Sequence, residues 1–393
     1  MAQAIVWTSP SGLLLLWLQV AILALVCHWL GRLRQRVLRS QLDVQKRAAQ
    51  GLQPQGDDGA DFLPTVDSLQ TEIPKTKGKN APPRPAEWAP LTEEELDVIQ
   101  KLQGWCKHPQ SSGTPFEEIP LDLVVSFVRG YRYRPDWPNA AFAYLDRAFR
   151  WRRAEGIDAP HPVMMRPTER LPDRAVFEKI FQCAPVGWDA DGHPVLLERF
   201  CQSMPEKIFG AFSQDGLMEQ LTFNRECQRA YCTAASARTG NRVFKCVVIV
   251  DLTGLCMAHT SKRMIALIRA INGLFSYHYP ESLQKVYVIH APFVFSSLWA
   301  IVKHILHPIT VAKLEVCGKS PWEALQKGGV TLTGGKIPDA DNLVGWHETM
   351  QRLRREMGDD NLLLNGWLPE ADREAMARRG LLATGGADAT ADK

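Results

Sequence analysis

The sequence predicts an α/β domain with a largely parallel sheet, preceded by a small helical subdomain and one transmembrane helix. Three patterns carry this prediction. Short β-rich runs alternate with helix-length segments between residues 173 and 338, an order typical of parallel sheets with crossover helices. Residues 86–160 repeat apolar positions at helical spacing, which indicates helices packed beside that sheet. Residues 12–31 contain no charged side chain, which indicates a helix within a bilayer.

The N-terminal apolar run is long enough to cross a membrane. It reads GLLLLWLQVAILALVCHWLG from Gly12 to Gly31, and a helix of this length spans about 30 Å. A cleaved signal peptide is the alternative, but no Lys or Arg precedes the run and no Ala-x-Ala-like site follows it. Arginines from Arg32 to Arg39 follow at once, and the positive-inside rule then places the C-terminal domain in the cytosol. We therefore expect a single-pass membrane protein, with the endoplasmic reticulum as its membrane.

A tether and a helical subdomain are expected next. Residues 32–85 are rich in Gln, Gly, Pro and Lys and have little apolar periodicity, which is typical of a flexible basic, proline-rich linker. In the subdomain at 86–160, Thr92 precedes three glutamates, as an N-cap does at the positive end of a helix dipole. A second helix is expected from Asn139 to Glu155, ending at Gly156.

Four β-rich runs define the strands of the domain predicted at 173–338: PVLLERF, VFKCVVIVDL, KVYVIHA and TVAKLEV. Helix-length segments from Asp215 to Arg238 and from Thr260 to Phe275 lie between them. The run VVIVDL is apolar on both faces, as expected for a central strand that is covered on both sides. Residues 339–393 are expected to form a short C-terminal helix and a polar tail, to which the sequence assigns no function.

Composition excludes several classes of function. Lys and Arg total 46 against 43 Asp and Glu, and a net charge of +3 gives no reason to expect nucleic acid as a partner. The nine cysteines form no C-x-x-C pair, which fits neither a zinc ribbon nor a disulfide framework. The chain contains no H-E-x-x-H pair and no G-x-S-x-G elbow. We therefore expect no metal, no cofactor and no enzymatic activity.

The segment 293–306 is apolar over most of its helical circumference and leaves only a thin polar stripe. Two interpretations fit this pattern. The helix is buried on two sides, or it is a gate that covers an apolar cavity when closed and dips into a bilayer when open. In the second interpretation, the side chains of the gate helix are Phe293, Phe295, Leu298, Trp299, Val302 and Ile305.

The stretch YPESLQKVYVIHAPFVFSSLWAIVKHILHPITVAKLEV resembles the signature half of the CRAL-TRIO family, which includes the secretory phosphatidylinositol/phosphatidylcholine exchange proteins. Upstream, GWDADGHPVLLERF resembles the family's Asp-x-x-Gly-x-Pro-Val strand, and VIVDLTGL resembles its Asp-Leu-x-Gly turn. SFVRGYRY resembles the helical lead-in. The resemblance covers about residues 120–338 and implies a lipid-binding domain with a mostly parallel sheet as its floor and a helical gate.

The resemblance also implies a set of ligand residues. In the phosphoinositide-binding branch, a Thr and a Lys after the gate helix, the Glu of Tyr-Pro-Glu and an Arg of the lead-in hold the inositol phosphate. They correspond here to Thr310, Lys313, Glu281 and Arg129. Cations neutralise a phosphodiester, a hydroxyl donates to it, and a carboxylate accepts from inositol hydroxyls. Taken alone, each residue could instead be a helix cap or a solvated charge.

The chain departs from the family pattern at three places. Ser282 replaces the basic residue that follows Tyr-Pro-Glu in that branch, so one phosphate contact is lost. Cys246 and Val248 stand where hydroxyl residues hold a choline headgroup, which favours phosphatidylinositol over phosphatidylcholine. His290 replaces an Asn before Ala-Pro.

These patterns predict a membrane-anchored lipid-transfer protein that exchanges a phospholipid, with phosphatidylinositol as the expected ligand, between membranes. The alternative is a regulatory or scaffold protein that senses a lipid, or another hydrophobic ligand such as a retinoid or tocopherol, and signals to a protein partner at its membrane. Neither function needs a covalent step, and the bound phospholipid is the only ligand expected.

Overall fold

The computed structural model describes residues 87–109, 111, 113–132, 134, 136–157, 173–318, 320–357 and 368–382. The chain divides into two units, 1–62 and 63–393. The first unit lies wholly outside the described residues. Everything below therefore concerns the second unit.

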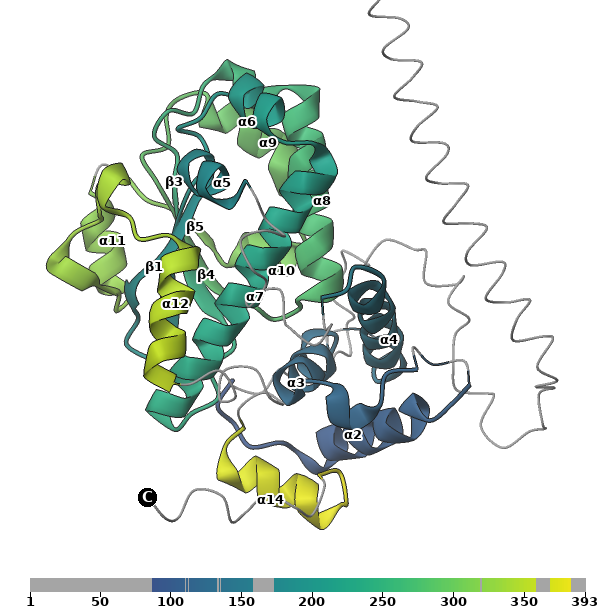
Figure 1. The fold of residues 1–393 in the computed structure, drawn as a ribbon. Helices are drawn as coiled ribbons and strands as arrows, with labels where there is room; N and C mark the ends of the chain where they lie inside the picture. Colours follow the sequence, from purple (N-terminus) through teal and green to yellow (C-terminus); the bar gives the residue numbers. More distant parts are fainter. Residues whose placement is uncertain are drawn as a thin grey trace, which may run out of the picture. The chain divides into compact units, whose positions relative to one another are not determined.

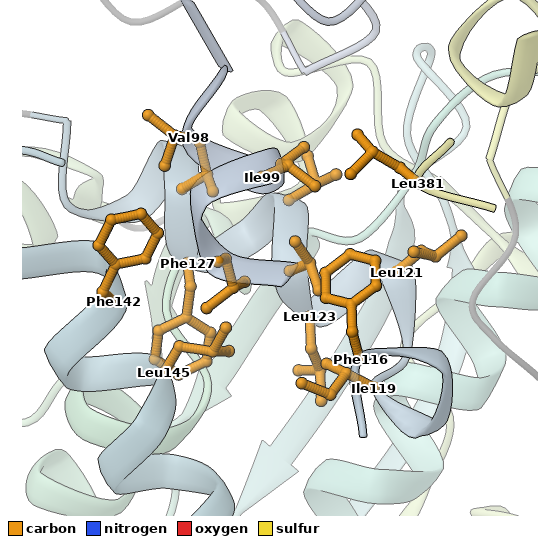
Figure 2. Close-up of a cluster of buried hydrophobic side chains, with 14 of the residues drawn as sticks. Val98, Ile99, Phe116, Ile119, Leu121, Leu123, Phe127, Phe142, Leu145 and Leu381 are labelled. Atoms are coloured by element: carbon orange, nitrogen blue, oxygen red, sulfur yellow. The ribbon is translucent and has the colours of Figure 1, made fainter. Parts of the chain in front are cut away.

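Three helices, α2 (Glu93–Cys106), α3 (Leu121–Gly130) and α4 (Asn139–Ala154), form the predicted helical region. Helix α2 begins at the expected cap: the Thr92 hydroxyl accepts from the Glu95 amide, and the Glu95 carboxylate accepts from the Thr92 amide. Their apolar faces form one buried cluster, which also includes Phe116, Ile119 and residues of the C-terminal segment. Figure 2 shows Leu381 beside Ile99 and Leu121 in this cluster.

A six-stranded sheet in the order β5-β4-β3-β2-β1-β6 forms the rest of the unit. Strands β2, β3, β4 and β5 pair in parallel, whereas β1 is antiparallel to both β2 and β6. The sheet is therefore mixed rather than wholly parallel, because β1 and β2 are joined by a short turn around Gly192 that is too short for a crossover helix. The strands are β1 (Gln182–Trp188), β2 (Pro194–Arg199), β3 (Cys246–Asp251), β4 (Leu283–Ile289), β5 (Leu314–Val316) and β6 (Thr331–Leu332).

Helices cover both faces of the sheet (Figure 1). Alternate residues of a strand point to opposite faces, and β3 follows this rule. Val248 and Val250 pack with Leu298 of α9 (Phe295–Ile305), while Val247 and Ile249 pack with Leu325 of α11 (Pro321–Lys327). The face of α9 also carries α7 (Gln214–Thr239) and α8 (Lys262–His278).

The remaining helices are short or lie at the periphery. The C-terminal helix α12 packs on α7 and β1, and α14 packs on the N-terminal helices. The remaining short or peripheral helices are η3 (Phe116–Glu118), α5 (Arg174–Ile180), α6 (Pro205–Ala211), η6 (Met257–Thr260), α10 (Pro308–Ala312), η7 (Thr333–Gly335), η8 (Ala340–Asn342), α12 (Trp346–Met357) and α14 (Glu370–Arg378).

The predicted membrane localisation is wrong on the evidence of this structure. In the described ranges, no helix combines the length and the apolar character that a bilayer crossing requires. Helix α9 is apolar but has 11 residues, about half of what a crossing needs, while the 26-residue α7 carries charged side chains along its length. The anchor predicted at 12–31 and the tether at 32–85 lie outside the described residues. The expected domain boundaries remain predictions.

Candidate functional site

A cavity of about 370 Å³ lies on the sheet face that carries α7, α8 and α9. Its volume falls within the range of small-molecule binding sites. Most of its wall is apolar and comes from the strands, from α8 and from α9. Representative lining residues are Phe200, Leu252, Leu267, Ile271, Phe275 and Val302.

Helix α9 covers this cavity with one face and turns the other to solvent, where Ile301 lies among Ser296, Ser297, Lys303 and His304. Leu298 is buried, and the rings of Phe295 and Trp299 stack with their centroids 5.9 Å apart along the cavity wall. On the outer side, Phe293 is 95% exposed and Ile301 is 40% exposed. A helix buried on two sides would not show this exposure, so the geometry favours the gate interpretation over the buried helix.

Five of the six predicted gate residues lie on the inner side of the helix, and the sixth precedes it. Phe295, Leu298, Trp299 and Val302 line the cavity. Ile305 packs against the same hydrophobic cluster without lining the cavity, and Phe293 precedes the helix with its ring in solvent.

Three of the four predicted ligand residues lie together at one end of the cavity. Glu281, Thr310 and Lys313 all line it. Glu281 follows α8 with a positive φ of 57°, and its carboxylate lies 3.2 Å from the Lys245 ammonium. Lys313 caps the short helix α10, and its ammonium donates to the Leu283 carbonyl. This end can therefore offer a cation, a hydroxyl and a carboxylate to one polar group.

The fourth residue, Arg129, does not line the cavity. Its guanidinium donates to the Glu95 carboxylate at 2.9 Å and to the carbonyls of Glu87 and Ala89 at 3.0 Å each. The neighbouring Gly130 does line the cavity, so the helical lead-in reaches the site while the arginine side chain leaves α3 in another direction. Arg129 fastens α3 to α2 and to the segment before it.

Comparison with known proteins agrees with this architecture. Residues 181–328 match the family model described as CRAL/TRIO domain. This chain carries a CRAL-TRIO domain. The match contains β1 to β5, the gate helix α9 and the short helix α10, and therefore most of the cavity. The predicted CRAL-TRIO domain is confirmed.

Two fungal relatives show how far the similarity extends. The SEC14 cytosolic factor of Eremothecium gossypii is 25% identical over 235 residues, which cover 60% of this chain and 70% of the relative. The CRAL-TRIO domain-containing protein YKL091C of Saccharomyces cerevisiae is 28% identical over 140 residues, or 35% of this chain and 45% of the relative. The chain thus spans less than half the length of the second relative. A solved structure of Sfh5 aligns with 67% of this chain and 98% of its own, at 15% identity and a TM-score of 0.45.

Sequence reasoning missed a polar group on the inner wall of the CRAL-TRIO cavity. Glu198 of β2 and Asn224, Arg225 and Gln228 of α7 line it. Burial raises the pKa of the Glu198 carboxyl, while Arg225 and Cys183 partly oppose this shift. The available signal was weak: Glu198 is one charge inside the apolar run PVLLERF, and α7 carries polar residues all around its axis.

A hydrogen-bond network fixes the turn before the gate helix. His290 has a positive φ of 54°, and its Nδ1 lies 2.9 Å from the Asp251 carboxylate and 3.3 Å from the Thr253 hydroxyl. Although burial favours the neutral acid, hydrogen bonds from Thr253, His290 and Arg199 lower the pKa of Asp251 to about 2. The histidine that replaces the family's Asn therefore binds the carboxyl end of β3 to the start of the gate.

Outside the cavity, Asp189, Asp191 and His193 bring their ligand-type atoms within 4.8 Å of one another. Both ring nitrogens of His193 are already occupied, because Nδ1 lies 2.8 Å from Asp189 and Nε2 lies 2.9 Å from Glu87. Burial would lower the pKa of His193, but the two carboxylates raise it to about 10. The cluster therefore fits a buried imidazolium between two carboxylates better than a metal site.

Proposed function

We propose that this protein binds one phospholipid in its CRAL-TRIO cavity and transfers it between membranes, with phosphatidylinositol as the preferred ligand. The observation that carries the proposal is an apolar cavity with a polar end, covered by a helix that leaves Ile301 exposed and is preceded by an exposed Phe293. Acyl chains in such a cavity avoid water, and each CH₂ exposed during exchange costs about 0.8 kcal/mol. Shielding the chains accelerates transfer without any covalent step, so no enzymatic group is required.

The polar end supports phosphatidylinositol over phosphatidylcholine. Glu281 can accept from inositol hydroxyls, and Lys313 and Thr310 can donate to a phosphate. On β3, Cys246 and Val248 are both buried among apolar side chains. Neither offers the hydroxyl that would orient a choline headgroup.

Lipid extraction and native mass spectrometry of the purified full-length chain test this proposal directly. Copurified phosphatidylinositol, and its transfer between labelled vesicles, are the expected results. Lys313→Ala should reduce phosphatidylinositol binding about tenfold or more, since a charge-assisted contact is worth about 1.5–3 kcal/mol. Lys303→Ala is the matched control, because Lys303 is an exposed lysine of the gate helix that does not line the cavity.

Three outcomes would count against the proposal. Equal loss in the two lysine variants would remove the headgroup assignment. Copurification of a retinoid- or tocopherol-like molecule would replace the phospholipid as ligand. Tight phosphatidylinositol binding without transfer between vesicles would favour a sensing or scaffold protein.

A further inference from the structure

Arg225 places a guanidinium inside the cavity without an ion-pair partner. Its Cζ lies 3.4 Å from the centre of the Phe275 ring, and an N–H donates to the Gln228 side chain. Both neighbours also line the cavity. Among the described residues, no carboxylate forms a salt bridge with Arg225. A charge held in an apolar cavity is costly unless an opposite charge compensates it.

The next arginine of the same helix, in contrast, has its charge compensated by carboxylates. Arg229, one turn further along α7, lies 2.8 Å from the Asp122 carboxylate and 2.7 Å from the Glu226 carboxylate. Glu226 also binds Arg152 at 2.8 Å. Helix α7 thus pairs the half-buried Arg229 with two carboxylates, whereas the half-buried Arg225, which lines the cavity, forms no salt bridge with a described residue.

Two contacts place Arg225 near the predicted headgroup end. The Gln228 amide, to which Arg225 donates, itself donates to the Ser282 carbonyl at 3.2 Å. The Lys313 ammonium donates to the carbonyl of the next residue, Leu283. Arg225 is therefore connected through Gln228 to the stretch that Lys313 contacts directly, and Ser282 in this stretch is the position where the expected basic residue is missing.

The carboxyl groups of Glu281 and Glu198, which line the cavity near Arg225 and Lys313, would not repel an anion. Glu281 is paired with Lys245 at 3.2 Å. Glu198 lies 3.9 Å from the Cys183 thiol and forms no salt bridge with a described residue, although the charge of Arg225 acts on it and lowers its pKa against the larger effect of burial. Because burial raises its pKa, Glu198 takes up a proton more readily than an exposed glutamate does. An anion that enters between Arg225 and Lys313 would thus meet two cations and little uncompensated negative charge.

We propose that Arg225 binds the phosphodiester of the phospholipid from α7 while Lys313 binds it from α10. Arg225 thereby supplies the guanidinium that the sequence assigned to Arg129 and the cation that Ser282 lacks. This inference rests on the proposed function, because it requires a phospholipid in the cavity. The contact is made to the phosphate, so it contributes to every phospholipid that enters, whereas Glu281 discriminates by the inositol ring.

The test combines Arg225→Gln, Arg225→Lys and the control Arg263→Gln in the full-length protein. Arg263 has the same type of contact, with its Cζ 4.0 Å from the Phe209 ring centre, but both lie outside the cavity lining. Binding is measured with vesicles that contain either phosphatidylinositol or phosphatidylcholine. We expect Arg225→Gln to weaken binding of both lipids by about ten- to a hundredfold. Arg225→Lys should retain most binding, and Arg263→Gln should not change it.

Thermal unfolding separates a ligand role from a structural role. Arg225→Gln removes an unpaired charge, so the lipid-free variant should melt at or above the temperature of the lipid-free wild type, and added phosphatidylinositol should raise this temperature less than in the wild type. A variant that melts lower without lipid yet binds both lipids normally would overturn the inference and leave the proposed function intact. Wild-type protein that retains no phospholipid would overturn both.

Discussion

Glu198 places a carboxyl on the apolar floor of the cavity, where its charged form is poorly solvated. Burial raises its pKa above the value of an exposed glutamate. The folded state therefore holds this proton more tightly than the unfolded state does. The resulting stability is fully present below the unfolded pKa of about 4.3 and is lost as pH rises through the higher pKa of the folded state.

Glu198→Gln should consequently stabilise the lipid-free protein at pH 7 and leave its stability unchanged at pH 4. Urea unfolding at both pH values measures this difference. Glu374→Gln, at an exposed position in the middle of α14, is the control and should have little effect at either pH, because its ion pair with Arg378 is exposed. A destabilised Glu198→Gln at pH 7 would mean that the carboxylate is ionised and held by Arg225, contrary to this account.

Site residues that belong to a recognisable motif could be predicted from the sequence. Site residues that reach the cavity only through tertiary packing could not. Glu281, Thr310 and Lys313 follow directly from the order of motifs around the gate, and all three line the cavity. Nothing in the sequence distinguishes Arg225 from Arg229, since both lie on the same polar helix. The distinction arises only because Asp122, 107 positions away in sequence, meets Arg229.

Among the elements, the gate helix both packs on the protein interior and exposes apolar side chains to solvent. Its inner side packs through Leu298, which is 4% exposed, whereas Ile301 on its outer side is 40% exposed and Phe293, just before the helix, is 95% exposed. The sequence predicted the wide apolar arc of this segment but left open whether protein covers both sides. Only the packing of α9 over β3 and β4 decides that question.

Alanine substitutions on the two sides of the gate should have different effects. Leu298→Ala should lower the free energy of unfolding by about 2–3 kcal/mol, near the lower end for buried leucines because the site borders a cavity. Phe293→Ala should leave stability unchanged and weaken vesicle association about tenfold, since a phenylalanine side chain gains about 1.5–3 kcal/mol on leaving water. Urea unfolding and vesicle cosedimentation measure these effects. Unchanged vesicle association in Phe293→Ala would remove the outer side of the gate from membrane contact.

Some strands of the sheet could be predicted from the sequence and others could not. The runs of β2, β3 and β4 were predictable because each contains several consecutive apolar or β-branched residues. The run TVAKLEV was only partly right: Leu314–Val316 forms β5, whereas Thr310 to Ala312 belong to the helix α10. Strand β1 was not predictable, because its sequence QCAPVGW contains a proline and a glycine, and its register shifts between Pro185 and Gly187. The antiparallel edge of the sheet therefore became visible only in the structure.

At the scale of the whole unit, Glu87 joins the first described segment to the α/β domain. Its carboxylate lies 2.9 Å from His193 and accepts from the backbone amides of Phe244 and Lys245 at 2.6 and 3.0 Å. Its carbonyl accepts from Arg129 and Arg242. Arg242 in turn binds Asp372 of α14, so the C-terminal segment, whose packing partner could not be predicted from the sequence, is held at the same point.

This arrangement makes the stability of the unit dependent on the charge of His193. Although burial lowers its pKa, the hydrogen bonds that the imidazolium donates to Asp189 and Glu87 raise it to about 10. The stabilisation is complete below the unfolded pKa of about 6.5 and is lost as pH rises toward 10, at about 1.4 kcal/mol for each unit of pKa shift. Urea unfolding at pH 6, 8 and 10 should show this decline in the wild type. The decline should be much smaller in His193→Gln, whereas the exposed-site control His304→Gln should behave as the wild type does. If His193→Gln declines as steeply as the wild type, the imidazolium does not hold the segments together, and Glu87 acts through its backbone contacts alone.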